Sequence, residues 1–358
     1  MMTNSQMLYV HIPFCSRKCF YCGFVSVNNQ KLWDKYFEKL YFELEQRKNN
    51  TPVSSIYFGG GTPSIVDIKY IQKCMSIIND NYNVQSNAEL TIEANPTLSV
   101  MQNLEKYRQM GFNRISFGVQ SLDEQKLAKL GRNQSGQDAV KCIKRACEIF
   151  ENVSADLLIG LEGQTKEEFL KDIDTLYDVG IKHLSVYMLM VEDGTKLFDM
   201  VKEKKYVPLD DDQAVNIYDA VMKHLKTKNV FRYEISNFAK KNYHSRHNLG
   251  YWQMKDYLGF GAAAHSFVKN KRFYNSENIA EYTENNIVKN EDLNEEQLNE
   301  ERIMLGLRTV YGVEERYIKN KTQLEKLLQD GFVKRVEDSI VICEECFNVA
   351  NQIILKLV

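Results

Sequence analysis

The sequence predicts an α/β protein with one parallel sheet in its N-terminal part and a small α+β domain at its C-terminal end. Short β-branched or aromatic runs alternate with longer stretches of helical periodicity. The gaps between successive runs leave room for a helix in each crossover, as parallel strands require. Six repeats are too few to close an eight-stranded barrel, so we expect a doubly wound sheet or an incomplete (β/α) barrel.

The predicted strands are short and rich in Val, Ile, Tyr or Phe, as strands of buried parallel sheets are. In chain order they are Leu8–Pro13, Ser55–Gly59, Glu89–Asn95, Arg114–Gln120, Ser154–Gly160 and His183–Leu189. The predicted helices repeat apolar residues three and four positions apart, which gives each helix one face to bury. They are expected near Lys31–Arg47, Ile65–Asn79, Val100–Met110, Gly136–Phe150, Lys166–Val179 and Asp211–Lys228.

The alternation of strands and helices ends near residue 231. Residues 231–290 are predicted to form a connecting region, which includes a histidine-rich stretch and the Gly/Ala-rich segment Gly259–His265. Residues 291–358 contain a helical segment around Leu324–Leu328, followed by a hairpin pattern over Phe332–Val336 and Ile340–Ile342. A helix followed by a small hairpin is typical of a winged-helix-like accessory domain. The predicted domains are therefore 1–230, 231–290 and 291–358.

Composition and charge exclude several classes of protein. The 46 basic and 48 acidic residues nearly cancel, so no broad surface for nucleic acid is expected. No apolar run approaches the ~20 residues that cross a bilayer. The polar N-terminal residues lack the features of a signal peptide. We therefore expect a cytoplasmic protein, in a compartment where structural disulfides are rare, with peripheral contact to the inner face of the membrane left open.

Three of the eight cysteines lie within eight residues, in the pattern Cys15-x3-Cys19-x2-Cys22. A structural zinc site needs four ligands, and the sequence has no fourth Cys or His at finger spacing. An iron–sulfur cube usually takes four thiolates, so three would leave one iron open to a substrate or cofactor. The open iron can chelate the amino and carboxylate groups of S-adenosylmethionine (SAM). We favour a cluster over a zinc site or three unrelated thiols.

The remaining cysteines carry weaker signals. Cys343 and Cys346 have the spacing of a redox motif, but they follow a predicted hairpin and are flanked by glutamates. A role without chemistry is favoured for this pair over metal or redox contact. Cys74, Cys142 and Cys147 lie on predicted helix faces and are expected to be small core residues.

Polar residues follow the predicted strands at their C-terminal ends, where parallel α/β folds gather their chemistry. They include the cysteine triplet, a Gly59-Gly60-Gly61-Thr62 run, Glu93 and Asp156. Two of these features also have a simpler structural explanation. The glycines could form a tight turn, and Glu93 could form an ordinary salt bridge. The glycine run lacks the Gly-Lys-Ser/Thr ending of a phosphate loop.

The segment Tyr9-x-His11-Ile12-Pro13-Phe14-Cys15-x3-Cys19-x-Tyr21-Cys22 resembles the signature of a radical SAM family. This is the oxygen-independent coproporphyrinogen III oxidase (HemN)-like family, which includes the HemW branch. The resemblance extends over roughly residues 7–270. Its other motifs are Tyr57–Ser64, Phe117–Ser121, Gly131-Arg132, Asp156–Leu161 and Tyr233–Ala239.

The resemblance implies an incomplete (β/α)6 radical SAM barrel that holds a [4Fe-4S] cluster on Cys15, Cys19 and Cys22. It also implies an electron donor of the flavodoxin or ferredoxin type. By matching positions, the residues that contact SAM are Tyr9, Gly60, Gly61, Thr62, Glu93, Gln120, Arg132 and Asp156. The oxidase uses some of these positions to hold a second SAM. Whether this chain binds one SAM or two is left open.

Three features favour the HemW branch, which is thought to bind haem and deliver it to acceptor proteins. Phe24 stands where the oxidase has its fourth cysteine, and the first strand starts too early to leave room for the oxidase's N-terminal extension. The third feature is a match to the HNxxYW motif, proposed as the haem site of HemW, with candidate haem contacts His247, Tyr251 and Trp252. His244 and His265 are secondary candidates.

Two other functions remain open at this point. One is oxidative decarboxylation of coproporphyrinogen III to protoporphyrinogen IX. The expected ligand is therefore haem if the protein is a chaperone, or a porphyrin if it is an oxidase. The other is a non-catalytic iron–sulfur redox sensor. The SAM-binding positions argue against the sensor, because a purely structural cluster has no use for an open iron.

Overall fold

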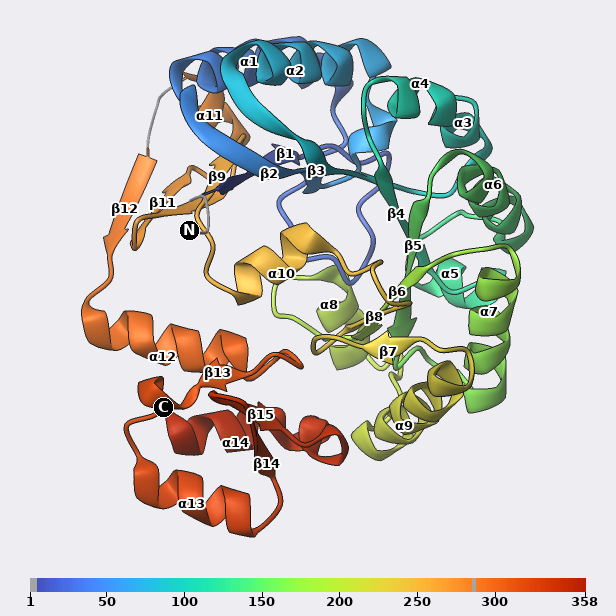
Figure 1. The fold of residues 1–358 in the computed structure, drawn as a ribbon. Coiled ribbons are helices and arrows are strands. Elements are labelled where there is room, and N and C mark those ends of the chain that lie inside the picture. The colour runs from blue at the N-terminus through green and yellow to red at the C-terminus, as the bar shows by residue number, and fades with distance from the viewer. Residues whose placement is uncertain (1–4, 285–287) are drawn as a thin grey trace.

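The computed structural model describes residues 5–284 and 288–358, and it confirms an α/β fold around one open sheet (Figure 1). Within the described residues this sheet has twelve strands, in the order β12-β11-β10-β9-β1-β2-β3-β4-β5-β6-β8-β7. Its six central strands run parallel and follow one another along the chain. They are β1 Gln6–Ile12, β2 Asn49–Gly60, β3 Tyr82–Ala94, β4 Arg114–Gln120, β5 Asn152–Ile159 and β6 His183–Met188. These are the six strands that the sequence predicts, with β2 and β3 extended at their N-terminal ends.

Helices in the crossovers cover the outer, convex side of the sheet, and α10 lies on its inner side (Figure 1). The outer helices are α1 Trp33–Gln46, α2 Ile68–Asn81, α3 Leu98–Met101, α4 Leu104–Gln109, α5 Glu124–Lys129, α6 Gly136–Ile149, α7 Lys166–Asp178 and α9 Asp211–Thr227. The single helix predicted over Val100–Met110 is divided into α3 and α4. Two short helices that were not predicted are α5 and α8 (Lys196–Lys202).

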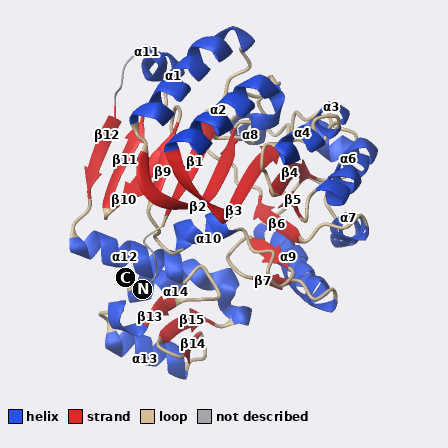
Figure 2. Cartoon of the chain, turned by 45° about the horizontal axis from the view of Figure 1, so that its top comes forward, coloured by secondary structure: helices blue, strands red, loops and turns tan. Residues whose placement is uncertain are grey.

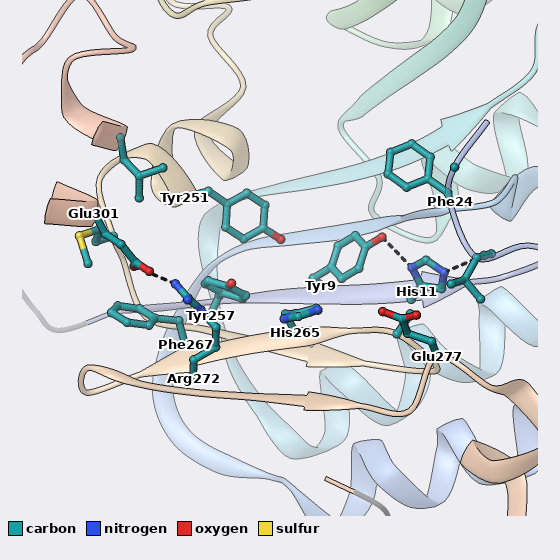
Figure 3. A pocket seen from close by; sticks show the side chains of 15 residues that line it. Tyr9, His11, Phe24, Tyr251, Tyr257, His265, Phe267, Arg272, Glu277 and Glu301 are labelled. Carbon is teal, nitrogen blue, oxygen red and sulfur yellow. Dashed lines mark hydrogen bonds and ion pairs between the residues drawn. The ribbon is translucent and has the colours of Figure 1, made fainter. Parts of the chain in front are cut away.

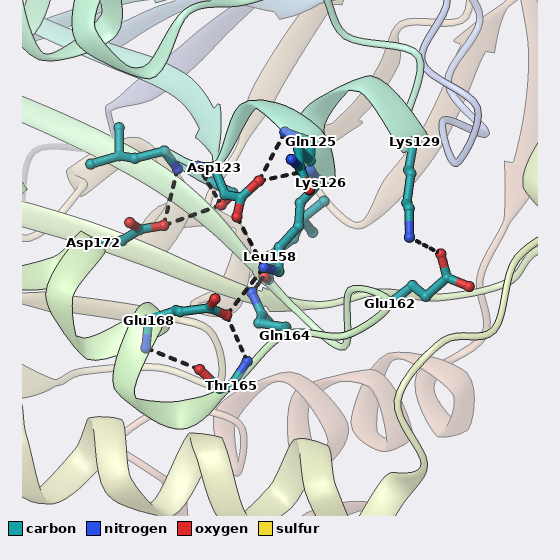
Figure 4. A network of polar contacts seen from close by, with 12 residues as sticks. Asp123, Gln125, Lys126, Lys129, Leu158, Glu162, Gln164, Thr165, Glu168 and Asp172 are labelled. Atoms are coloured by element: carbon teal, nitrogen blue, oxygen red, sulfur yellow. Dashed lines mark hydrogen bonds and ion pairs between the residues drawn. The ribbon is translucent and has the colours of Figure 1, made fainter.

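The outer helices are held by caps and by polar contacts between neighbours. Thr165 and Glu168 form a reciprocal capping box at the start of α7. Lys126 of α5 binds both Asp123 and Glu168, while the side chain of Asp172 accepts the backbone N–H of Leu122 (Figure 4). These contacts fix the segment after β4 against α7.

Residues 231–290 add strands to both edges of the sheet. At one edge, β7 (Phe231–Arg232) and β8 (Asn237–Ala239) pair antiparallel next to β6. At the other edge, β9 pairs parallel with β1. The antiparallel strands β10 to β12 then continue the sheet. The remaining elements of this part are α10 Arg246–Trp252, β9 Tyr257–Phe260, β10 His265–Val268, β11 Lys271–Asn275, α11 Ile279–Glu284 and β12 Val288–Asp292.

The C-terminal segment has its own apolar core, separate from that of the large sheet. It contains a small sheet in the order β13-β15-β14, and the predicted helix and hairpin correspond to α13, β14 and β15 (Figure 2). The Arg232 guanidinium of β7 lies 3.5 Å from the ring centroid of Phe347, a residue of the C-terminal core. The elements are α12 Glu295–Gly306, β13 Val313–Glu314, α13 Lys321–Gln329, β14 Val333–Val336, β15 Ser339–Ile342 and α14 Ala350–Leu357.

The described residues, 5–284 and 288–358, contain no helix with both the length and the apolarity needed to cross a membrane. The division of the chain at 230 and 290 stays a prediction.

Candidate functional site

The three clustered cysteines lie on the loop that follows β1, at the C-terminal ends of the parallel strands. Backbone hydrogen bonds anchor this loop. The N–H of Cys15 donates to the carbonyl of Val27 at 3.1 Å, and the N–H of Phe20 donates to the carbonyl of Leu130 at 2.9 Å. The loop is therefore a built structure on which the half-buried cysteines have defined positions.

The three thiols line a cavity of about 340 Å³ together with residues from the ends of β2, β3, β4 and β5. Seven of the eight predicted SAM contacts lie on its wall. They are Gly60, Gly61, Thr62, Glu93, Gln120, Arg132 and Asp156. Among the described residues, no three Cys, His, Asp or Glu side chains converge on one metal-ion position. Thiolates of an iron–sulfur cube bind different irons, so lining a shared cavity is the arrangement that a cluster needs.

The glycine run is more than a tight turn, because it packs its backbone directly against the end of β1. The N–H of Gly61 donates to the carbonyl of Ile12 at 2.9 Å, and the N–H of Thr62 donates to the carbonyl of Phe14 at 2.8 Å. The Thr62 hydroxyl lies 3.5 Å from the sulfur of Cys15. A side chain at position 61 would meet three backbone atoms within 3.0 Å. Glycine at this position permits the approach of β2 to the cysteine loop.

Arg132 lies inside the site and not on the surface. Its guanidinium donates to the Asn95 side chain at 2.6 Å and to the carbonyl of Gly118 at 2.7 Å. It also reaches the sulfur of Cys19 and the hydroxyl of Tyr21, both at 3.5 Å. Arg132 therefore joins β3, β4 and the cysteine loop and places a positive charge beside the thiols.

Two carboxyl groups in the cavity lack a cationic partner within salt-bridge distance among the described residues. Burial raises the pKa of Glu93 to about 7, although Tyr57 donates a hydrogen bond to it at 2.7 Å. Burial also raises the pKa of Asp156, which accepts a hydrogen bond from Ser116 at 3.3 Å. Buried carboxylates need a positive or hydrogen-bonding partner. A ligand with a sulfonium cation and ribose hydroxyls supplies both kinds of group.

The sequence did not single out several residues of this wall, among them Ser116 and Tyr187. The signal for Ser116 was available, because residues two apart on a strand share a face and Gly118 also lines the cavity. Gln120 has a φ of 69°, which is rare for a residue other than glycine and is characteristic of functional sites. Ser121, at the same strand end, turns away and bonds to Asp172.

A second cavity, of about 600 Å³, lies beside β1 and the added strands β9 to β11 (Figure 3). Tyr9 lines this cavity and not the cysteine-lined one, and its hydroxyl bonds to Nδ1 of His11 at 2.9 Å. Burial lowers the pKa of His11 to about 4, so this imidazole is neutral. Phe24, with 69% of its side chain exposed, lines both cavities. The two cavities are therefore neighbours across the cysteine loop.

The HNxxYW residues lie on α10 but do not share one surface. His247 is fully buried, with Nδ1 at 2.8 Å from the Ser55 hydroxyl and Nε2 at 2.9 Å from the Tyr251 hydroxyl. Tyr251 lines the second cavity. Trp252 packs elsewhere, with Tyr233, Tyr243 and Leu249. Trp252 is adjacent to Tyr251 on the helix and therefore points in another direction. Of the three residues, only Tyr251 faces this cavity.

The two secondary histidine candidates are also separated. His265 is exposed at the start of β10 and lines the second cavity. His244 stacks on Tyr233, and its Nδ1 lies 3.1 Å from the Tyr311 hydroxyl. Outside these sites, Cys74 and Cys142 are fully buried, as predicted for core thiols. Cys343 and Cys346 lie beside the C-terminal hairpin, with the sulfur of Cys346 3.9 Å from the carbonyl of Gly331.

Comparisons with known proteins agree with this geometry. Residues 9–176 match the pattern that defines the Radical SAM superfamily. The chain is 32% identical to a protein of Bacillus subtilis named heme chaperone HemW, over 96% of this chain and 97% of that protein. A protein of Lactococcus lactis with the same name is 30% identical, over 95% of this chain and 92% of that protein.

A solved structure has the same fold over almost the whole chain. Coproporphyrinogen III oxidase (HemN) of Escherichia coli, described as a radical SAM enzyme, superposes with a TM-score of 0.85. The match covers 99% of this chain and 90% of the oxidase at 21% identity. The open sheet of this chain is therefore the incomplete barrel of the radical SAM fold.

Proposed function

Because this chain belongs to the HemW family of radical SAM proteins, we propose that it is a haem chaperone with a SAM-binding [4Fe-4S] cluster. The cluster is assigned to Cys15, Cys19 and Cys22, and SAM to the cavity of about 340 Å³ that these cysteines line. Haem is assigned to the neighbouring cavity of about 600 Å³. The partners are an electron donor of the flavodoxin or ferredoxin type and a haem-acceptor protein.

The residues of the first cavity fit their assigned ligands. When bound, the cluster would supply one electron for reductive cleavage of SAM into methionine and a 5′-deoxyadenosyl radical. The protein's own contribution is positioning. The backbone of Gly60 and Gly61 forms a wall without side chains, Glu93 and Asp156 balance positive charge, and Arg132 joins the cysteine loop to β3 and β4.

The charge of the second cavity is the observation that favours haem over coproporphyrinogen III. Among the described residues, the one arginine of its wall is Arg272, which is already paired with Glu291 at 3.2 Å and Glu301 at 2.8 Å. Two carboxyl groups, Glu277 and Glu301, also line the wall, among tyrosines and apolar residues. A tetracarboxylate would meet net negative charge there. Haem presents a flat apolar macrocycle to such a wall, and its two propionates can remain in water.

Direct transfer of haem tests the chaperone proposal. Haem-loaded protein is mixed with increasing concentrations of haem-free haemoproteins from the same source, with apomyoglobin as a passive sink. Delivery by contact gives a rate that rises with acceptor concentration and exceeds the passive rate of release. A rate equal to passive release for every acceptor would contradict the proposal.

The raised pKa of Glu93 predicts that SAM binds more tightly as the pH rises. With a pKa of about 7, Glu93 is mostly protonated at pH 6 and mostly ionised at pH 8. A cationic ligand favours the carboxylate, so binding at pH 6 must also release the proton. We expect SAM to bind about tenfold more weakly at pH 6 than at pH 8. Equilibrium dialysis of cluster-loaded protein, kept oxidised and anaerobic to prevent cleavage, measures this difference.

Two controls identify the titrating group. Glu93→Gln cannot ionise and should flatten the pH dependence. S-adenosylhomocysteine, which lacks the sulfonium charge, should show a weaker pH dependence in the unmodified protein. An unchanged slope in Glu93→Gln would assign the effect to another group.

A further inference from the structure

Two histidines of the described residues line the second cavity, and of these His11 bonds through both ring nitrogens, to Tyr9 and to the carbonyl of Val25, whereas His265 bonds through neither. We propose that His265 is the axial ligand of haem in this cavity and that His247 positions Tyr251 on its wall. This inference rests on the haem-binding function proposed above and assigns its ligand. The imidazoles of His265 and His247 differ in what their ring nitrogens contact.

Both ring nitrogens of His247 are already engaged in hydrogen bonds. A histidine ligand binds iron through the lone pair of one ring nitrogen. Both nitrogens of His247 lie within 2.9 Å of a hydroxyl group, and the ring is fully buried between α10 and β2. Ligation would break one of these buried hydrogen bonds, at Ser55 or at Tyr251, without bringing the ring into the cavity.

His265 has the opposite environment. Its side chain is exposed to the cavity, and its ring nitrogens have no hydrogen-bond partner among the residues that the structure describes. The ring stacks on Tyr274 of β11, with centroids 4.7 Å apart and planes 16° from parallel. In the view of Figure 3 it lies below Tyr9, among the labelled side chains of the cavity. Stacking holds the imidazole in one plane and leaves its edge open to a ligand.

The turn before β10 determines where His265 lies on the cavity wall. Ala263, two residues before His265, has a φ of 60°, and Met254 has a φ of 52°. Both residues line the cavity. Met254 follows the C-terminal end of α10, where a left-handed residue commonly ends a helix, and Ala263 takes its left-handed φ in the turn before β10. The N–H of Ala263 donates to the carbonyl of Ser276 at 2.9 Å, which fixes the turn that presents His265.

The electrostatic setting favours the form of His265 that binds iron. Burial, and then the nearby Arg272 guanidinium, lower the pKa of this imidazole below its ordinary value. The neutral form, which has the free lone pair, is therefore the main one at neutral pH. The role left for His247 is to hold the Tyr251 hydroxyl, four residues along α10, so that the Tyr251 ring forms the opposing wall.

Haem titration of the full-length, cluster-loaded protein tests the assignment. His265→Ala should weaken haem binding at least about tenfold, which corresponds to about 1.4 kcal/mol, and should shift the Soret band. In His265→Gly, added imidazole should restore the original spectrum. His247→Gln should keep the imidazole-ligated spectrum, even if Tyr251 moves and affinity falls. His244→Ala, outside the cavity, serves as the matched control and should bind haem as the unmodified protein does.

The outcomes separate this inference from the proposed function. If His265→Ala keeps both the affinity and the spectrum, or if His247→Gln alone loses the imidazole signature, the assignment to His265 is wrong and the haem-binding function stands. If the unmodified protein shows no saturable binding of one haem per chain, the proposed function itself fails.

Discussion

Replacing Cys19 by serine is expected to abolish the absorption of the iron–sulfur cluster and to reduce 5′-deoxyadenosine formation to the background level. Cys19 is one of three thiols on the cavity wall, and its sulfur lies 3.5 Å from the Arg132 guanidinium. A serine hydroxyl stays protonated at neutral pH and cannot replace a thiolate that holds iron. Absorption spectra and product analysis after anaerobic reconstitution and reduction measure both effects.

The matched control is Cys346→Ser, which makes the same chemical change beside the C-terminal hairpin. This variant should keep both the cluster and SAM cleavage. Undiminished 5′-deoxyadenosine formation in Cys19→Ser would remove the basis for the cluster assignment.

Replacing Gly61 by alanine is expected to destabilise the fold by about 3 kcal/mol and to weaken SAM cleavage with it. The added Cβ would lie 2.6 Å from the carbonyl oxygen of Phe14, 2.8 Å from its nitrogen and 2.9 Å from the carbonyl oxygen of Ile12. Backbone atoms cannot rotate away as a side chain can. Since Phe14 directly precedes Cys15, the required shift moves the cysteine loop. Chemical denaturation measures the change in unfolding free energy.

Gly163→Ala provides the comparison for this prediction. Gly163 has a left-handed φ of 68° but no atom within 4 Å of an added Cβ. Its substitution should cost only the backbone strain, about 1–2 kcal/mol. A Gly61→Ala variant no less stable than Gly163→Ala would show that the close approach of β2 to the end of β1 is not required.

The sequence predicts the central sheet well because its signals are local. Each of the six parallel strands is a compact apolar run before a helical pattern, and all six are confirmed. The strands of residues 231–292 escaped prediction because they are short and are defined by distant partners. Strand β9 includes Gly259, a residue of low strand propensity, and its place is fixed by pairing with β1, far away in the chain.

In the candidate site, too, some features were predictable from the sequence and others were not. The cysteine triplet was predicted from its spacing and the SAM candidates from the family resemblance, and the structure brings seven of these eight candidates to one cavity. The contacts of His247 were not predictable, because they depend on Ser55 of β2 and on the pitch of α10. Likewise, Tyr9 faces the second cavity because alternation along β1 sets its direction, while a motif match says nothing about the face.

If this chain carries a tetrapyrrole without converting it, as proposed, the tetrapyrrole must leave the protein chemically unchanged. Cluster-loaded protein is incubated anaerobically with SAM, a reductant and either haem or coproporphyrinogen III, and the extracted tetrapyrroles are separated by chromatography. We expect haem to be recovered unchanged from a complex of one haem per chain, and coproporphyrinogen III to keep its four carboxyl groups. Multiple turnovers of coproporphyrinogen III to protoporphyrinogen IX would contradict this expectation and establish the oxidase function.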